Sequence, residues 1–311
     1  MSDMPTPASL LGPEAAELLR RETRHLVRDL ESLDEEQWSL KTVYGNTTIL
    51  DVVSHLCKEA DRVATAWDEH YEHMDEPLFR ATDDPREHAT VEEDVDPDEA
   101  LATYQESMDR LQKTLQQARQ DDWQWPVMTP SGEAETLAEA ARRWLAHHYV
   151  HRQDIREIIG RIVDRHEDTV QLVVEFVLDA IARQGREIMP HPMRVEFTTG
   201  MPGAGTWTLV FDEPEEIRSE YVTVWEEILG WEPDKPSAHR VERGTTGAPR
   251  VRISGDGEQV WRAGFRRGAR FDDLNVHGDD EALSAWSRLR QKLDEQGLEQ
   301  RIGIPVDEDD V

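Results

Sequence analysis

The chain has 311 residues, with 35 Lys or Arg against 66 Asp or Glu, and a formal net charge of −31 at pH 7. Because nucleic-acid phosphates need a basic surface and anionic lipids repel an acidic one, this charge argues against nucleic acid and membranes as partners. Hydrophobic residues still make up 37% of the chain, including 10 Trp, so we expect folded cores, and the length fits two domains of ~100–200 residues.

The first half of the chain carries apolar residues at helical spacing in four segments. Helices are predicted over residues 13–33, 49–67, 100–118 and about 134–159, with an acidic, proline-containing loop over residues 75–98. Pro13 suits the first turn of its helix, and Thr47 or Thr48 can cap the second. Four such helices with one long connection predict a four-helix bundle.

The second half mixes helices with short runs typical of strands. A helix is predicted over residues 168–182, then strands over 193–198, 206–211 and 250–253, a helical stretch over 258–264, a strand over 274–277 and a helix over 279–296. We therefore predict a two-domain α+β protein, with a bundle over residues 1–163 and a small α+β domain with an acidic tail over residues 164–311.

The basic residues are almost all arginine. Lysine is confined to Lys41, Lys58, Lys113, Lys235 and Lys292. An acid-rich, lysine-poor surface suits concentrated salt, where screening acts over ~3 Å at 1 M, so we expect a halophilic-type protein; full stability without salt would contradict this.

The sequence carries no recognisable targeting signal. Residues 1–11 lack the basic and apolar regions of a signal peptide, and no window approaches ~18 consecutive apolar residues. The single cysteine, Cys57, excludes an internal disulfide. We expect a cytoplasmic protein.

Three histidines are the strongest candidates for a site. His147 and His151 lie one helical turn apart on the fourth helix, a spacing at which two imidazoles can bind one ion, and His55 faces the interior from the second helix. Together they would leave a fourth metal position to water or substrate. Two alternatives remain: the histidines are simply buried and hydrogen-bonded, or His148 replaces His147 as the inward residue.

Three segments of the first half, "LDEEQW" (33–38), "GNTTILDVVSHL" (45–56) and "HHYVHRQDIREIIG" (147–160), resemble the DinB-like metal-binding bundle. More narrowly, they resemble the mycothiol-dependent maleylpyruvate isomerase family. This resemblance implies that His55, His147 and His151 are the metal ligands. The family has a glutamate where this chain has His147, so the set is closer to the broader DinB-like superfamily, which includes bacillithiol transferases.

The second half resembles that family's companion domain. The segment "VRISGDGEQVWRAGFRRGARFDDLNVHGDDEALSAW" (251–286) is similar to its sterol-carrier-protein-like domain. The resemblance implies a bound divalent metal, with Zn²⁺ expected first and Ni²⁺ or Fe²⁺ also suited to three imidazoles. It further implies a low-molecular-weight thiol cosubstrate such as mycothiol, and a small electrophilic substrate.

The predicted function is therefore a metal-dependent, thiol-using isomerase or S-transferase. Two alternatives compete with it: a metal-dependent hydrolase of the DinB-like superfamily, and a non-catalytic protein with a structural metal and an apolar ligand in the second domain. The oligomeric state is left open.

Two carboxylates near the histidines are further candidates. Asp154 is assigned a catalytic role, as an acceptor that orients His151 or a neighbouring group; the alternative is a surface carboxylate paired with an arginine. Glu59, four residues after His55, would serve as a fourth ligand or a base, although a helical salt bridge is the simpler interpretation.

Arginines cluster densely between residues 262 and 270. A guanidinium binds carboxylate or phosphate through two parallel hydrogen bonds, so the cluster would hold an anionic substrate or thiol conjugate. Arg266 lies nearest the arginine of the resembled family and is assigned a catalytic role, whereas Arg262 and Arg267 are assigned to cofactor binding. The alternative is that these arginines neutralise the acidic surface around them.

Overall fold

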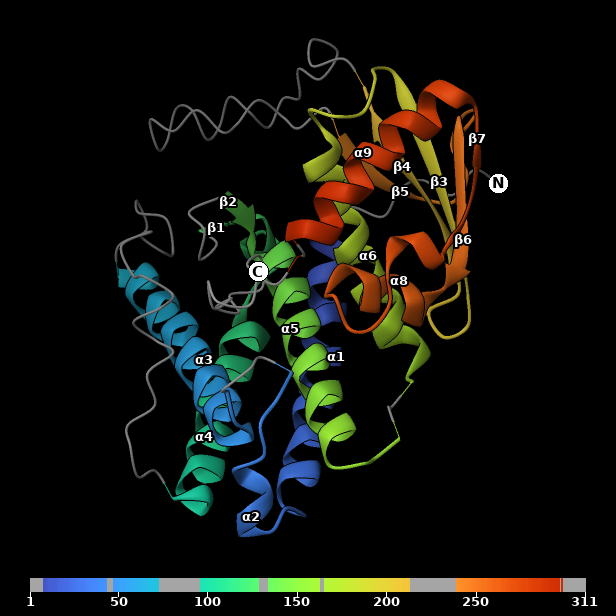
Figure 1. Cartoon of the computed structure of the whole chain (residues 1–311). Coiled ribbons are helices and arrows are strands. Elements are labelled where there is room, and N and C mark those ends of the chain that lie inside the picture. The colour runs from blue at the N-terminus through green and yellow to red at the C-terminus, as the bar shows by residue number, and fades with distance from the viewer. Residues whose placement is uncertain are drawn as a thin grey trace. The chain divides into compact units, whose positions relative to one another are not determined.

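The structure is a computed structural model that describes residues 8–43, 47–72, 96–128, 134–162, 165–212, 239–296 and 298. Over these residues the chain divides into two compact units, one up to residue 162 and the other from residue 165 (Figure 1). The first is almost wholly helical and the second combines helices with a sheet. The two-domain α+β class predicted from the sequence is confirmed.

Within the described residues, the N-terminal unit is built around four long helices. The pairs α1–α5, α3–α4 and α1–α4 pack against each other, as a bundle requires (Figure 1). The elements are α1 (Ala8–Leu30), α2 (Glu35–Trp38), α3 (Ile49–Glu72), α4 (Pro97–Gln117), the 3₁₀ turn η2 (Asp122–Gln124), β1 (Pro126–Met128), β2 (Ala134–Thr136) and α5 (Leu137–Ile158).

The helix starts follow from their capping residues. The hydroxyl of Thr48 accepts a hydrogen bond from the Asp51 amide at 3.2 Å, so the predicted cap of α3 is present. Pro97 takes the first turn of α4, which therefore begins inside the predicted 75–98 loop; residues 73–95 lie outside the described part. Pro13, in contrast, lies inside α1 and not in its first turn, because the helix already begins at Ala8.

Four short elements of this unit, α2, η2, β1 and β2, were not predicted from the sequence. Helix α2 and the hairpin of β1 and β2 have only three or four residues each, too few to display a hydrophobic period, and α5 begins after the hairpin at Leu137. Strand β5 of the C-terminal unit was not predicted either. It follows residues 213–238, which lie outside the described part.

The C-terminal unit contains a five-stranded sheet among its described residues, in the order β5-β4-β3-β6-β7. Strands β3 and β6 pair in parallel and the other neighbours pair antiparallel. Helix α6 packs against β4, β5, α8 and α9 (Figure 1). The elements are α6 (Glu167–Gly185), β3 (Met193–Gly200), β4 (Gly205–Phe211), β5 (His239–Arg243), β6 (Val251–Asp256), α8 (Gly257–Gly264), the 3₁₀ turn η4 (Phe271–Asp273), β7 (Asn275–Gly278) and α9 (Asp280–Gln296).

Large apolar side chains fill the interior of this unit. Phe197 of β3 and Phe271 both meet the Trp286 ring of α9 edge-on, with ring centroids 5.6 Å and 6.4 Å away. None of the described helices is long and apolar enough to cross a lipid bilayer.

Helix α5 is buried on every side over most of its length. Its buried residues run without a break from Ala140 to Ile155 and include three histidines, three arginines and an aspartate. Polar groups without water must find partners within the protein, because an unpaired buried charge costs several kcal/mol, of the order of 3–5. The partners of these α5 residues define the candidate site.

Candidate metal centre

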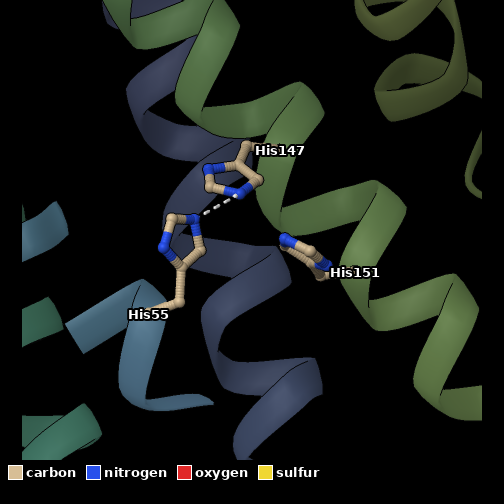
Figure 2. A group of neighbouring side chains, drawn as sticks. All are labelled: His55, His147 and His151. Carbon is tan, nitrogen blue, oxygen red and sulfur yellow. Dashed lines mark hydrogen bonds between the residues drawn. The ribbon is translucent and has the colours of Figure 1, made fainter. Parts of the chain in front are cut away.

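Three imidazoles meet in the interior of the N-terminal bundle. His55 comes from α3, and His147 and His151 come from consecutive turns of α5 (Figure 2). One ring nitrogen from each residue lies within 4.8 Å of the other two, and the Nε2 atoms of His55 and His147 are 3.2 Å apart. His147 and His151 are fully buried, whereas His55 is partly exposed. Among the described residues, these three histidines form the group of potential ligands whose spacing fits a metal ion.

His148 is not part of this group. Its Nδ1 lies 2.9 Å from the Trp144 carbonyl oxygen, which can only accept, so Nδ1 carries the proton; its Nε2 lies 3.3 Å from the Met108 sulfur. Burial lowers the pKa of His148 to about 4 and keeps the ring neutral. The inward residue is therefore His147, and the alternative with His148 is wrong.

Glu59 connects the two helices that carry the histidines. Its Oε2 lies 2.6 Å from Nδ1 of His147, and its Oε1 accepts a hydrogen bond from Nη1 of Arg143 at 3.1 Å. Arg143 also donates through Nε to Glu135 at 2.9 Å. The interpretation of Glu59 as a partner in a helical salt bridge is therefore wrong: the carboxylate crosses from α3 to α5, which helical spacing on one helix could not reveal.

This contact fixes the direction of the His147 ring. A carboxylate accepts, so the Nδ1–H of His147 donates to Glu59, and the other ring nitrogen, Nε2, faces His55. Burial alone would raise the pKa of Glu59, but His147 and Arg143 outweigh it and hold this pKa well below its usual range. The carboxylate is therefore charged inside the bundle.

The donor set suits a divalent metal ion. Imidazole nitrogens bind a metal in their neutral form, and burial, followed by the neighbouring histidines, lowers the pKa of His151 well below its usual value. The carboxylate behind His147 matches the arrangement in which a ligating histidine donates its other N–H to an acid. Three nitrogen donors with an open position are typical of catalytic zinc sites.

Two other side chains near the histidines are also buried. Asp154 is 2% exposed, so the alternative of a surface carboxylate is wrong; its role in orienting His151 stays a prediction. Burial and the nearby Asp61 raise the pKa of the Cys57 thiol to about 12, which leaves it protonated and unsuited as a nucleophile.

The arginine cluster of the C-terminal unit follows α8. Arg262 donates to Glu258 at 3.0 Å and to the Arg267 carbonyl at 3.2 Å, and Arg267 donates to the Phe265 carbonyl at 2.6 Å. These contacts brace the turn and fit the alternative of local neutralisation; a cofactor-binding role for Arg262 and Arg267 stays a prediction.

Arg266 has a different environment. Its φ of 52° is in the left-handed region, which favours glycine. It lines a cavity of about 710 Å³ whose other charged residues are of both signs, namely Arg270, Asp272, Arg290, Asp294 and Glu295. Such a lining can pair with an anionic or a polar ligand.

Residues 19–156, which include all three histidines, match the family described as "Mycothiol maleylpyruvate isomerase N-terminal domain". The match covers most of the N-terminal unit. The resemblance drawn from the sequence is thereby confirmed.

Two solved structures are similar to the chain over both units. One is a crystal structure of mycothiol-dependent maleylpyruvate isomerase and the other is a mutant of that enzyme, with TM-scores of 0.52 and 0.53. Each is 15% identical in sequence, and each alignment covers 86% of this chain and 94% of the other. At this identity the similarity establishes the fold. None of the curated proteins matches the chain.

Proposed function

We propose that this protein is a metal-dependent enzyme of the maleylpyruvate isomerase type, which uses a low-molecular-weight thiol such as mycothiol to isomerise, or to form an S-conjugate with, a small electrophile. The observation that carries the proposal is the group of three imidazole donors backed by a buried carboxylate. The family that the N-terminal unit matches supports the choice of a thiol cosubstrate.

His55, His147 and His151 are the proposed ligands. A divalent metal held by them would act as a Lewis acid and lower the pKa of a bound thiol or water. The two α5 histidines are fully buried and orient their nitrogens toward His55, which is partly exposed. A cosubstrate would therefore reach the centre from the side of His55. Zinc is the first expectation, and nickel or iron also suits three imidazoles.

The position of Glu59 favours a catalytic metal over a structural one. Both of its oxygens are engaged, one by His147 and the other by Arg143, so the carboxylate supports a ligand instead of acting as a fourth one. Three protein ligands leave a position for an exchangeable molecule, which is the pattern of catalytic sites.

In the C-terminal unit, we propose that Arg266 binds an anionic group of the substrate or of its thiol conjugate. Two observations support this role: the cavity that Arg266 lines and the left-handed backbone that an arginine adopts there at an energetic cost. Asp154 is retained as a candidate for orienting His151.

The first test is the metal content of full-length, untagged protein purified in high salt without chelator, by elemental analysis. We expect close to one metal per chain, loss of that metal in His151→Ala, and its retention in His148→Gln, a matched change of a buried histidine on the same helix. Thiols and small electrophiles would then be assayed in pairs. A wild-type protein that binds no metal even after reconstitution would overturn the proposal.

A further inference from the structure

We infer that Glu59 is a positioning residue for the metal centre: its carboxylate fixes the His147 ring and supplies the negative charge that three neutral imidazoles lack, while Arg143 keeps it from becoming a ligand. This inference rests on the proposed function, because it presupposes a metal held by the three histidines. The sequence analysis treated Glu59 chiefly as a helical salt-bridge residue, and the structure assigns it a different part.

Glu59 bridges the two helices that carry the proposed ligands. Glu59 lies one turn beyond His55 on α3, and its Oε2 reaches across to Nδ1 of His147 on α5 at 2.6 Å. A single side chain thus links the helix of one proposed ligand to the helix of the other two. Direct contact between the two helices is otherwise limited compared with the α1–α5 and α3–α4 pairs. The contact also sets which nitrogen of His147 is left to bind the metal.

Glu59 also contributes charge to the centre. Three neutral imidazoles bring no charge to balance a dication in a buried site. Behind them, the Arg143 guanidinium lies between the carboxylates of Glu59 and Glu135, and all three side chains are buried. One positive and two negative charges leave one net negative charge beside the donors. In an interior of low dielectric, this charge acts on the metal with little screening.

Arg143 keeps Glu59 out of the coordination position that must stay open. Arg143 holds Oε1 of Glu59 at 3.1 Å while His147 holds Oε2, and Glu135 in turn holds Arg143 at 2.9 Å. Glu135 lies on β2, directly before the residue that caps α5. The hairpin and the start of α5 therefore anchor the arginine, and the arginine holds the carboxylate behind the ligand.

The test is the Zn²⁺ affinity of the full-length protein, measured by competition with a chromophoric chelator, together with the visible spectrum after Co²⁺ substitution. Glu59→Gln keeps the shape and removes the charge, and we expect about 10–100-fold weaker Zn²⁺ binding, the usual cost of losing a partner behind a ligand. Glu59→Asp, which keeps the charge, should recover part of that loss.

The matched control is Glu22→Gln. Glu22 is likewise a buried carboxylate of the same bundle, and it accepts a hydrogen bond from Arg152 at 2.8 Å. We expect this change to lower stability and to leave Zn²⁺ affinity and the Co²⁺ spectrum unchanged. Equal losses of affinity in both variants would mean that only general stability is affected, and would overturn the inference.

The same substitution is also made in a second variant, His147→Glu, in case Glu59→Gln alone does not fold. In His147→Glu a carboxylate takes the ligand position itself and faces Glu59 at close range, so the buried charges repel. There the added Glu59→Gln change should strengthen Zn²⁺ binding instead of weakening it. The same sign in both backgrounds would contradict the proposed role.

The outcomes also separate the inference from the proposed function. If the wild type binds Zn²⁺ and Glu59→Gln binds it as tightly, the inference fails and the proposed function stands. If the wild type binds no metal, both fall together.

Discussion

Ion pairs lie in opposite environments in the two units of this protein. In the N-terminal bundle, Arg152 donates to Glu22 at 2.8 Å and to Asp29 at 3.0 Å, and all three are buried. In the C-terminal unit, Arg250 pairs with Asp279 and Glu281, each at 2.8 Å, at the surface. The distances are alike, so any difference in how much the two sets of ion pairs stabilise the protein comes from the solvent around them.

In this strongly acidic chain, the buried ion pairs contribute more to stability than those at the surface. Surface pairs are screened and contribute little, whereas removal of one member of a buried pair leaves an uncompensated charge without water. Arg143 and Arg152, which form buried ion pairs in the bundle, both lie on α5, the helix that carries two of the proposed metal ligands. The charges inside the bundle therefore hold α5 in place.

The largest effect is expected from Arg152→Ala. The change leaves Glu22 and part of Asp29 buried without their arginine, and we expect the free energy of unfolding of the N-terminal unit to fall by about 3–5 kcal/mol. Arg250→Ala, which removes an equally short pair at the surface, should leave chemical denaturation almost unchanged. Similar shifts of the denaturation midpoint in the two variants would contradict the comparison.

A smaller loss of stability is expected at acidic pH. Burial raises the pKa of Asp29, but its hydrogen bonds with Arg156 and Arg152 outweigh this and lower the pKa below its usual value. The charged form is thus favoured in the folded protein, so the stability it contributes is present above the unfolded-state pKa of ~3.9 and is lost as pH falls through the lower, folded-state value.

Thermal unfolding measured from pH 6 downward should reveal this contribution as a loss of stability that begins below about pH 4 and is reduced in Asp29→Asn. The pKa of Asp279, lowered to about 2 chiefly by its hydrogen bond with Arg250, provides the surface comparison. In 1 M KCl, where screening acts over ~3 Å, the contribution of Asp279 should vanish and that of Asp29 persist. A loss of both in salt would mean that Asp29 is effectively solvated.

The smallest expected effect, and the one of opposite sign, is at Arg266. Glycine adopts the left-handed conformation without the clash that an arginine suffers there, so Arg266→Gly should raise the free energy of unfolding of the C-terminal unit by at most about 1 kcal/mol. Activity should fall in the same variant if Arg266 binds substrate.

Arg270→Gly is the matched control for this change. Arg270 lines the same cavity, but its φ of −129° is ordinary, so glycine there should lower stability. Unchanged activity in Arg266→Gly would remove Arg266 from the proposed site.

Several features of the fold were accessible from the sequence because they depend on local chemistry. The cap at Thr48, the amphipathic stripes of the long helices and the strands at residues 193–200 and 205–211 are properties of neighbouring residues. The short hairpin ending at Thr136 was not accessible, because its strands of three residues are stabilised by pairing across a turn and not by a pattern. Its position matters, since it carries Glu135.

That His147 and His151 share a helix face followed from their spacing, because four residues make about one turn of any α-helix. The sequence also pointed to His55 as their partner. The choice between His147 and His148 required the packed structure, since it depends on how α5 is rotated against α3 and α4, with His148 turned to Met108. The same packing brought Glu59 to His147 across 88 positions of the chain, a contact that no local periodicity encodes.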